Sequence, residues 1–150
     1  MHHGAWAGYG PGPAHLIHVY CNPQSLVFIV NATPAYVEVL LEELRGAGVR
    51  LLPKVLNSNF SAAERADMYM LGGCHFVTSR ILTVDLLTMK VPTHLVTGLI
   101  VCDAHRVVDT ANEAFILRLY REANQTGFVK AFTDQPESFL HDFNKVEKVM

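Results

Sequence analysis

Short apolar runs alternate with helical patterns along most of this chain, and this alternation restricts its fold more than any other feature. The first strong run is Leu26-Val27-Phe28-Ile29-Val30. A continuous run of β-branched and aromatic residues is typical of a strand that is buried on both faces of a parallel sheet. Further strands are predicted over residues 49–52, 75–78, 95–103 and 128–132. The sequence therefore provides the strands of a five-stranded sheet.

The segments between these strands carry helix signals. Thr33 is a suitable N-cap, and Pro34 fits the first turn of a helix whose apolar residues recur at helical spacing until Gly46 and Gly48 end it. Further helices are predicted over residues 61–71, 81–88 and 109–124, and from 136 to the last residue. Alternation of strands and helices predicts an α/β fold with a mostly parallel sheet and right-handed crossovers.

Composition indicates one folded domain and excludes several classes of protein. Half of the 150 residues (50%) are hydrophobic and 17% are charged, so the chain can bury a core and is not disordered. Because the net charge is −2, any DNA contact must come from a local basic patch. The apolar runs are too short for a membrane helix. Residues 1–13, rich in glycine and proline, are predicted to be a flexible leader before a domain at 14–150.

The cysteines and histidines show no metal-ligand pattern. Cys21, Cys74 and Cys102 lie far apart in the sequence and form no C-x-x-C pair. This spacing argues against a disulfide framework and a zinc site, and it fits a reducing compartment. His15 and His18 share a possible helix face, with no carboxylate or cysteine beside them. Because a metal needs three or four convergent ligands, we expect no metal site.

A Thr-Ser-Arg segment directly follows the strand predicted at 75–78. Thr78 and Ser79 stand where a helix begins, and Arg80 follows them. Hydroxyl groups and free helix N–H groups can receive an oxyanion at such a position, and an arginine can pair with it. The alternative is a structural role, in which Ser79 caps the helix and Arg80 is a solvated charge. The segment is therefore a candidate phosphate contact.

A second polar segment, Cys102-Asp103-Ala104-His105, ends the strongest apolar strand after the first. Functional groups collect at the carboxyl ends of parallel strands. Asp103 could hold a magnesium ion through water there, or be a satisfied carboxylate without a ligand. Phe132-Thr133-Asp134 also ends a predicted strand, but it is not specific. The sequence contains no G-x-x-x-x-G-K-[ST] loop, so it offers no basis for nucleotide hydrolysis.

A few basic residues could form the local positively charged patch that DNA contact would require. Arg118 and Arg121 are three residues apart and share a face of the helix predicted over 109–124. Arg80, Arg106 and Lys130 could join them. The alternative is ordinary solvation of a helix surface.

The motifs together form a pattern that runs through the second half of the chain. It comprises Gly72-Gly73-x-x-Phe76-x-Thr78-Ser79-Arg80-Ile81-Leu82, Val84-Asp85-x-Leu87-Thr88, Thr97-Gly98-x-x-Val101, Ala104-His105-Arg106, Glu113-Ala114-Phe115-Ile116-Leu117-Arg118-Leu119, Gly127-Phe128-x-Lys130-Ala131-Phe132-Thr133-Asp134 and Val146-Glu147-x-Val149-Met150. This pattern closely resembles the XPF family, the catalytic large subunits of the eukaryotic nucleotide-excision-repair endonuclease. The resemblance is dense over residues 72–150, weaker over 14–71 and absent from the leader.

The resemblance implies a three-layer, RecA-like lobe of a degenerate superfamily-2 helicase module, incomplete at both ends. It places Thr78-Ser79-Arg80 at a motif that contacts the DNA backbone. It places Asp103-Ala104-His105 at the DEAH-box position, with Ala104 in place of the catalytic glutamate. In the family this module has lost ATP hydrolysis, binds single-stranded and junction DNA, and docks scaffold proteins. We therefore expect Thr78, Ser79 and Arg80 to contact DNA, with weaker support from Arg106, Arg118, Arg121 and Lys130.

The nuclease centre of the family has no counterpart in this sequence. The chain contains neither an E-R-K-x-x-x-D motif nor the tandem helix-hairpin-helix region that binds the small partner subunit. The family's nuclease domain uses a divalent metal such as magnesium, so we assign no catalytic residue and no cofactor to this chain. The resemblance implies a nuclear role in nucleotide excision, interstrand crosslink and recombination repair, with single-stranded or fork DNA and scaffold and repair proteins as partners, and no membrane.

Two other functions stay open at this point. A pure protein-interaction module without DNA contact fits the net charge of −2 and the apolar last predicted helix, which has no stop signal. That helix either docks back or belongs to a longer protein. An ATP-binding lobe would bind ATP with magnesium, and the missing lysine and glutamate argue against it.

Overall fold

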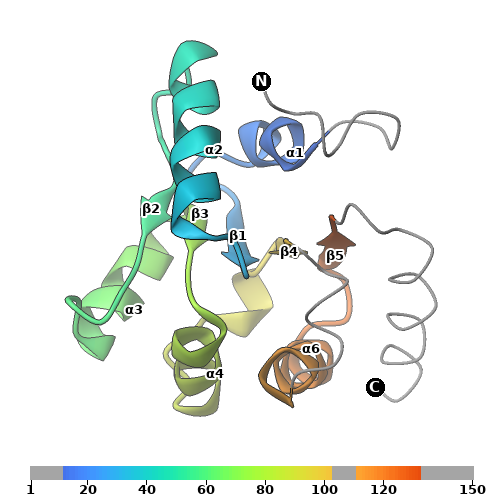
Figure 1. Ribbon diagram of the computed structural model, residues 1–150. Helices are drawn as coiled ribbons and strands as arrows, with labels where there is room; N and C mark the ends of the chain where they lie inside the picture. Colours follow the sequence, from blue (N-terminus) through green and yellow to red (C-terminus); the bar gives the residue numbers. More distant parts are fainter. Residues whose placement is uncertain (1–11, 103–110, 133–150) are drawn as a thin grey trace.

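A five-stranded parallel sheet forms the centre of the computed structural model, which describes residues 12–102 and 111–132. The strands are β1 (Leu26–Val30), β2 (Lys54–Val55), β3 (Gly73–Phe76), β4 (Gly98–Val101) and β5 (Phe128–Ala131). Their order across the sheet is β2-β3-β1-β4-β5, and every neighbouring pair is parallel (Figure 1). The predicted α/β fold with a parallel sheet is confirmed.

Helices cover both faces of this sheet and make a three-layer structure (Figure 1). They are α1 (Pro13–Val19), α2 (Pro34–Gly46), α3 (Ala62–Met70), α4 (Ser79–Leu87), the 3-10 turn η2 (Thr93–Leu95) and α6 (Ala111–Ala123). Side chains of β1 alternate between the layers, as the pleat requires. Phe28 packs with α3, α4 and α6, whereas Ile29 packs with α1 and α2. The central strand is therefore buried on both faces, as its apolar run predicted.

The helix starts follow from capping side chains. Thr33 accepts a hydrogen bond from the Tyr36 N–H at the start of α2, where Pro34 occupies the first helical position as predicted. Ser61 and Glu64 form a reciprocal capping box at the start of α3. Each cap satisfies N–H groups that have no carbonyl partner inside the helix.

The predicted boundaries of the other strands need correction. The strand expected at 49–52 is absent, and β2 begins only after Pro53, which has no N–H group to donate to a sheet. Val49 and Leu52 instead pack from a loop onto the layer of α1 and α2. The strand expected at 75–78 lies two residues earlier, because Thr78 caps a helix. The strand expected at 95–103 begins only at Gly98, because residues 93–95 form a 3-10 turn. Residues 1–11 and the helix predicted from 136 lie outside the described residues.

His75 of β3 is a fully buried histidine on the α3 side of the sheet. Its ring packs against Phe28 and Tyr69, with centroid separations of 5.8 and 5.5 Å. Neither ring nitrogen has a hydrogen-bond partner among the described residues. Burial, helped by the positive charge of Lys54 on the neighbouring strand, lowers the pKa of His75 from 6.5 to about 4. The folded protein therefore holds this ring neutral.

We expect this histidine to make stability depend on pH. The unfolded chain takes up a proton near pH 6.5, whereas the folded chain resists protonation until about pH 4. The free energy of unfolding should therefore fall as the pH drops through this window, by about 2 kcal/mol at pH 5 from His75 alone. Urea unfolding near pH 7.5 and near pH 5 measures the loss. His75→Leu should remove that part of it, whereas His94→Leu, at an exposed histidine, should not. An equal loss in wild type and His75→Leu would contradict this assignment.

Candidate nucleic-acid interface

A cleft of about 510 Å³ opens at the carboxyl edge of the sheet, where β1, β2 and β3 end. Three segments that are far apart in the sequence form its walls: the loop from β1 into α2, the residues after β2, and the start of α4. They meet because parallel strands deliver their carboxyl ends to one edge. Its volume lies within the range of ordinary ligand-binding clefts.

The cleft has an apolar floor and a polar rim. Ile29, Val37 and Phe76 contribute apolar lining. Its polar lining residues are Asn31, Thr33, Glu38, Asn57, Thr78 and Ser79. Such a lining suits a ligand with one apolar part and one polar or charged part. The negative charge of the Glu38 carboxylate would repel an anionic ligand, so the cleft as a whole is not strongly basic.

Two residues of the predicted Thr-Ser-Arg segment, Thr78 and Ser79, line this cleft, and Arg80 follows them as an exposed residue of α4. Thr78 is the N-cap of α4, and its hydroxyl accepts a hydrogen bond from the Ile81 N–H at 3.1 Å. The cap is therefore Thr78 and not Ser79, which lies in the first turn and lines the cleft. The N–H groups of Ser79 and Arg80 lie in the first turn of α4, so no carbonyl within the helix is available to accept their hydrogen bonds. No acidic residue lies in this first turn, so the positive end of the helix dipole is not neutralised there.

A second capped helix opens on the same cleft from β1. Asn31 follows this strand with a φ of 66°, a left-handed conformation that asparagine tolerates better than most residues. Its side-chain amide donates a hydrogen bond to the Cys102 carbonyl at 2.8 Å and ties the end of β1 to the end of β4. Sequence reasoning did not assign Asn31, Glu38 or Asn57 to the site. The available signal was their position directly after strands or in the first turns of a following helix.

The other predicted DNA-binding residues do not gather around this cleft. Arg118 is exposed on α6. Arg121 lies at the far end of that helix, where it donates to the Gly127 carbonyl at 2.7 Å and lies 5.3 Å from the centre of the Tyr120 ring. Because α6 returns the chain from the carboxyl edge to the amino edge, Arg121 is remote from Arg80. Arg106, with Asp103, Ala104 and His105, lies outside the described residues.

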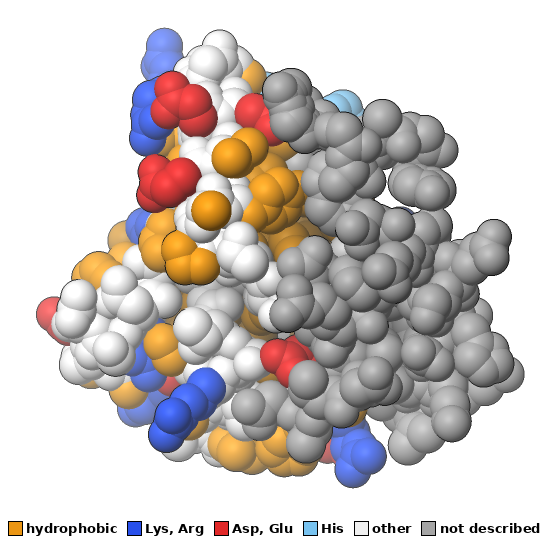
Figure 2. Space-filling model, viewed as in Figure 1, with side chains coloured by type: hydrophobic (Ala, Val, Ile, Leu, Met, Phe, Trp, Pro, Cys, Tyr) orange, Lys and Arg blue, Asp and Glu red, His pale blue; other side chains and the backbone are white. Residues whose placement is uncertain are grey.

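Lys130 is separated from these arginines by the sheet itself. Val129 and Ala131 of β5 pack on the layer of α3, α4 and α6, so the alternate residue Lys130 faces the other side, where it is exposed. Figure 2 shows Lys and Arg side chains at separate places on the described part of the face in view. The structure therefore keeps Thr78, Ser79 and Arg80 together only as consecutive residues at the start of α4, with Arg118, Arg121 and Lys130 elsewhere.

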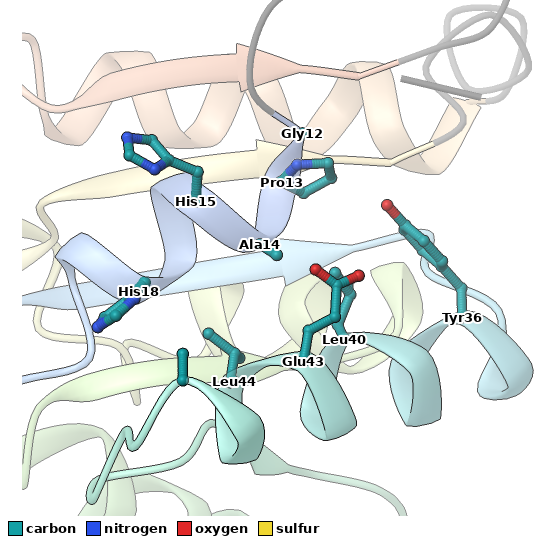
Figure 3. Close-up of a pocket in the computed structure, with 10 residues that line it drawn as sticks. Gly12, Pro13, Ala14, His15, His18, Tyr36, Leu40, Glu43 and Leu44 are labelled. Carbon is teal, nitrogen blue, oxygen red and sulfur yellow. The ribbon is translucent and has the colours of Figure 1, made fainter. Parts of the chain in front are cut away.

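A smaller cavity of about 240 Å³ lies between α1 and α2 (Figure 3). His15 and His18 of α1 and Glu43 of α2 contribute to its lining. Figure 3 shows that the two imidazole rings do not converge on the Glu43 carboxylate. Within residues 12–102 and 111–132, no group of three or more His, Cys, Asp or Glu side chains is arranged to hold a metal ion. No helix in these ranges is long and apolar enough to cross a membrane.

Comparison with solved structures shows the class of fold. The crystal structure of the Pyrococcus furiosus Hef helicase domain matches with a TM-score of 0.62 and 18% sequence identity, over 89% of this chain and 36% of that one. The chain therefore has a RecA-like fold, similar to that of the Hef helicase domain. No protein-family model matches it.

Comparison with curated proteins then identifies the family. The DNA repair endonuclease XPF of Cricetulus griseus is 43% identical over 136 residues, which are 91% of this chain. DNA repair protein rad16 of Schizosaccharomyces pombe is 41% identical over 87% of the chain, and RAD1 of Saccharomyces cerevisiae is 33% identical over 91%. The chain is homologous to these XPF-type DNA repair proteins over about nine tenths of its length, and it spans only 15% of their length.

Proposed function

We propose that this chain is a non-catalytic, helicase-like lobe of an XPF-type DNA repair endonuclease that contacts the backbone of single-stranded or fork DNA. The observation that carries the proposal is the position of Thr78 and Ser79 in the lining of the cleft, with the exposed Arg80 directly after them in the first turn of α4. Free helix N–H groups, a serine hydroxyl and an arginine are groups that bind phosphate. The homology supports a nuclear setting and a role in excision, crosslink and recombination repair.

Backbone contact also fits the weak charge of the lobe. The net charge is −2, and Glu38 lies on the cleft wall, so the interaction would be modest and sensitive to salt. Contacts to phosphate carry no sequence information, because every nucleotide presents the same phosphate group. The lobe would therefore orient DNA for the remainder of a larger protein and would not select a sequence.

Arg80→Ala tests the contact directly. We expect the variant to bind a labelled single-strand/duplex fork more weakly by about the same factor for every DNA sequence, and to lower the slope of log affinity against log salt by about one. Fluorescence anisotropy at several salt concentrations measures both quantities. Arg50→Ala is the matched control, because Arg50 is also exposed but lies between α2 and β2 at the opposite edge of the sheet. An unchanged affinity and slope for Arg80→Ala would remove Arg80 from the site.

A second role in docking repair or scaffold proteins is supported by the amino edge of the sheet. Exposed apolar side chains lie at the ends of α3 and α4, namely Met70, Leu71, Leu87 and Met89. Met89 is 88% exposed. Protein-interaction surfaces use exposed apolar side chains of this kind. A folded chain that binds no fork DNA in the anisotropy experiment would favour docking as its sole role.

A further inference from the structure

The cleft at the carboxyl edge of the sheet offers no positive charge from its lining. None of the described residues that line its volume of about 510 Å³ is basic. Apolar side chains make up more than half of this lining, and two of them, Pro34 and Val55, are exposed. Phosphate needs charged or polar partners, which the proposed backbone contact places at the start of α4. The apolar interior of the cleft therefore fits a different part of a nucleotide.

Glu38 of α2 defines the polar chemistry on one wall of this cleft. It is exposed and lines the cavity. Within residues 12–102 and 111–132, its carboxylate has neither an ion-pair nor a hydrogen-bond partner. A carboxylate can only accept hydrogen bonds, so it repels phosphate but favours a ligand that carries N–H groups. The cleft is thus matched to a neutral ligand with a donor at its edge.

Asn57, which follows β2, contributes to a different wall. Its side-chain Oδ1 accepts a hydrogen bond from the Asn59 N–H at 2.9 Å, so a ligand would meet its amide NH2 group, a donor. The two walls together offer an acceptor at Glu38 and a donor at Asn57 above an apolar floor. A nucleobase has the complementary surface, because its faces are apolar and its edges carry both N–H donors and oxygen or nitrogen acceptors.

We propose that this cleft receives one unpaired base of single-stranded DNA, and that Glu38 accepts a hydrogen bond from the exocyclic amino group of adenine, cytosine or guanine. The inference rests on the proposed function, because backbone contact at Ser79, which lines the same cleft, brings the strand to it. Thymine has no amino group, and its carbonyl oxygens would be repelled by the carboxylate.

Such a cleft would read the state of the strand and not its sequence. In a duplex, the Watson–Crick edge of each base is occupied by its partner, whereas an unpaired base can turn out of the stack and present this edge to a protein. The preference concerns a single base at a time, and any strand of mixed sequence contains adenine, cytosine or guanine. The lobe would therefore favour unpaired DNA of almost any sequence.

Fluorescence anisotropy of the whole chain with three labelled single strands of equal length tests this inference. One strand contains only cytosine, one contains only thymine, and one is abasic, so that it keeps every phosphate without the bases. We expect the cytosine strand to bind about two- to tenfold more tightly than the thymine strand, as for one hydrogen bond. It should bind about fivefold or more tightly than the abasic strand. The salt dependence should be the same for all three, because their phosphates are the same.

Glu38→Ala should abolish the preference for cytosine over thymine, whereas Glu42→Ala should keep it. Glu42 is the matched control, because it is an exposed glutamate of the same helix that pairs with Arg45 and does not line the cleft. Both substitutions remove one negative charge, so a general effect of charge on DNA binding appears equally in both variants. Both positions are exposed, so neither variant should disturb the fold.

The results that would overturn this inference are distinguishable from a failure of the proposed function. Equal binding of the three strands, with a salt dependence that Arg80→Ala lowers, would leave the backbone contact in place and exclude a base from the cleft. A preference for cytosine that persists in Glu38→Ala would overturn the assigned hydrogen bond. If no strand bound in a salt-sensitive way, the proposed function would fail, and this inference with it.

Discussion

Replacing Asp85 with alanine should lower the free energy of unfolding by about 3–5 kcal/mol, because it leaves a buried arginine without its carboxylate. Asp85 of α4 is 0% exposed, and Arg65 of α3 is 8% exposed. The guanidinium donates to both carboxylate oxygens at 2.7 Å and to the Phe60 carbonyl at 2.7 Å. The Tyr69 hydroxyl also donates to Asp85, and burial raises the pKa of this tyrosine, so it stays neutral.

Urea unfolding at neutral pH measures this loss, and two further variants sharpen it. Asp67→Ala makes the same substitution at an exposed position of α3 and should change stability by less than about 0.5 kcal/mol. The double variant Arg65→Leu with Asp85→Leu removes both charges together, and it should be less destabilised than Asp85→Ala. If Asp85→Ala and Asp67→Ala cost the same, the buried ion pair does not stabilise the junction of α3 and α4.

Gly72→Ala should destabilise the lobe by more than about 3 kcal/mol, since strain and a steric clash act together. Gly72 has a φ of +78°, and a Cβ atom there would lie 2.3 Å from the Pro23 carbonyl oxygen and 2.9 Å from that of Ser25. The next residue, Gly73, donates to the Ser25 carbonyl at 2.6 Å, so the backbone of this turn is held against the segment before β1. The clash cannot be relieved without moving the start of β3.

Variants at two other glycines distinguish the cost of backbone strain from the cost of the steric clash. Gly48 has a φ of +83° in open space, so Gly48→Ala should show the conformational cost alone, about 1–2 kcal/mol. Gly46, at the end of α2, has open space and no positive φ, and Gly46→Ala should be neutral or slightly stabilising. Thermal or urea unfolding of the three variants should rank them in this order. A Gly72 variant no worse than the Gly48 variant would show that the neighbouring backbone can move aside.

The class of fold was predictable from sequence because β1 is apolar at all five positions and the helix caps are local signals. β2 was missed because it has only two residues. The apolar residues before it, Val49 and Leu52, belong to a loop and pack onto the layer of α1 and α2. The structural alternative considered for the Thr-Ser-Arg segment named Ser79 as the cap of α4, whereas the cap is Thr78. The two residues are adjacent, and both suit a cap. The positions of these short elements depend on tertiary pairing, which local sequence does not contain.

The candidate site was predictable only in part, for a related reason. Thr78, Ser79 and Arg80 follow a strand directly and could be found from that position. Their neighbours in the cleft could not be found in this way, because they meet only when β1 inserts beside β3. The strand order also places Arg121 and Lys130 away from Arg80, although sequence spacing allowed one patch. The residues of the Arg65–Asp85 pair are far apart in the sequence and left no sequence signal at all.

The position of β1 in the middle of the sheet also has a consequence during synthesis. β1 leaves the ribosome before the other strands of this sheet, yet its two partners, β3 and β4, are made much later. Until residue 101 has emerged, one edge of this apolar strand has no partner. Such distant pairings slow folding and leave apolar surface open to aggregation. A nascent chain that pauses between β3 and β4 should therefore be an especially good substrate for chaperones that bind extended apolar segments.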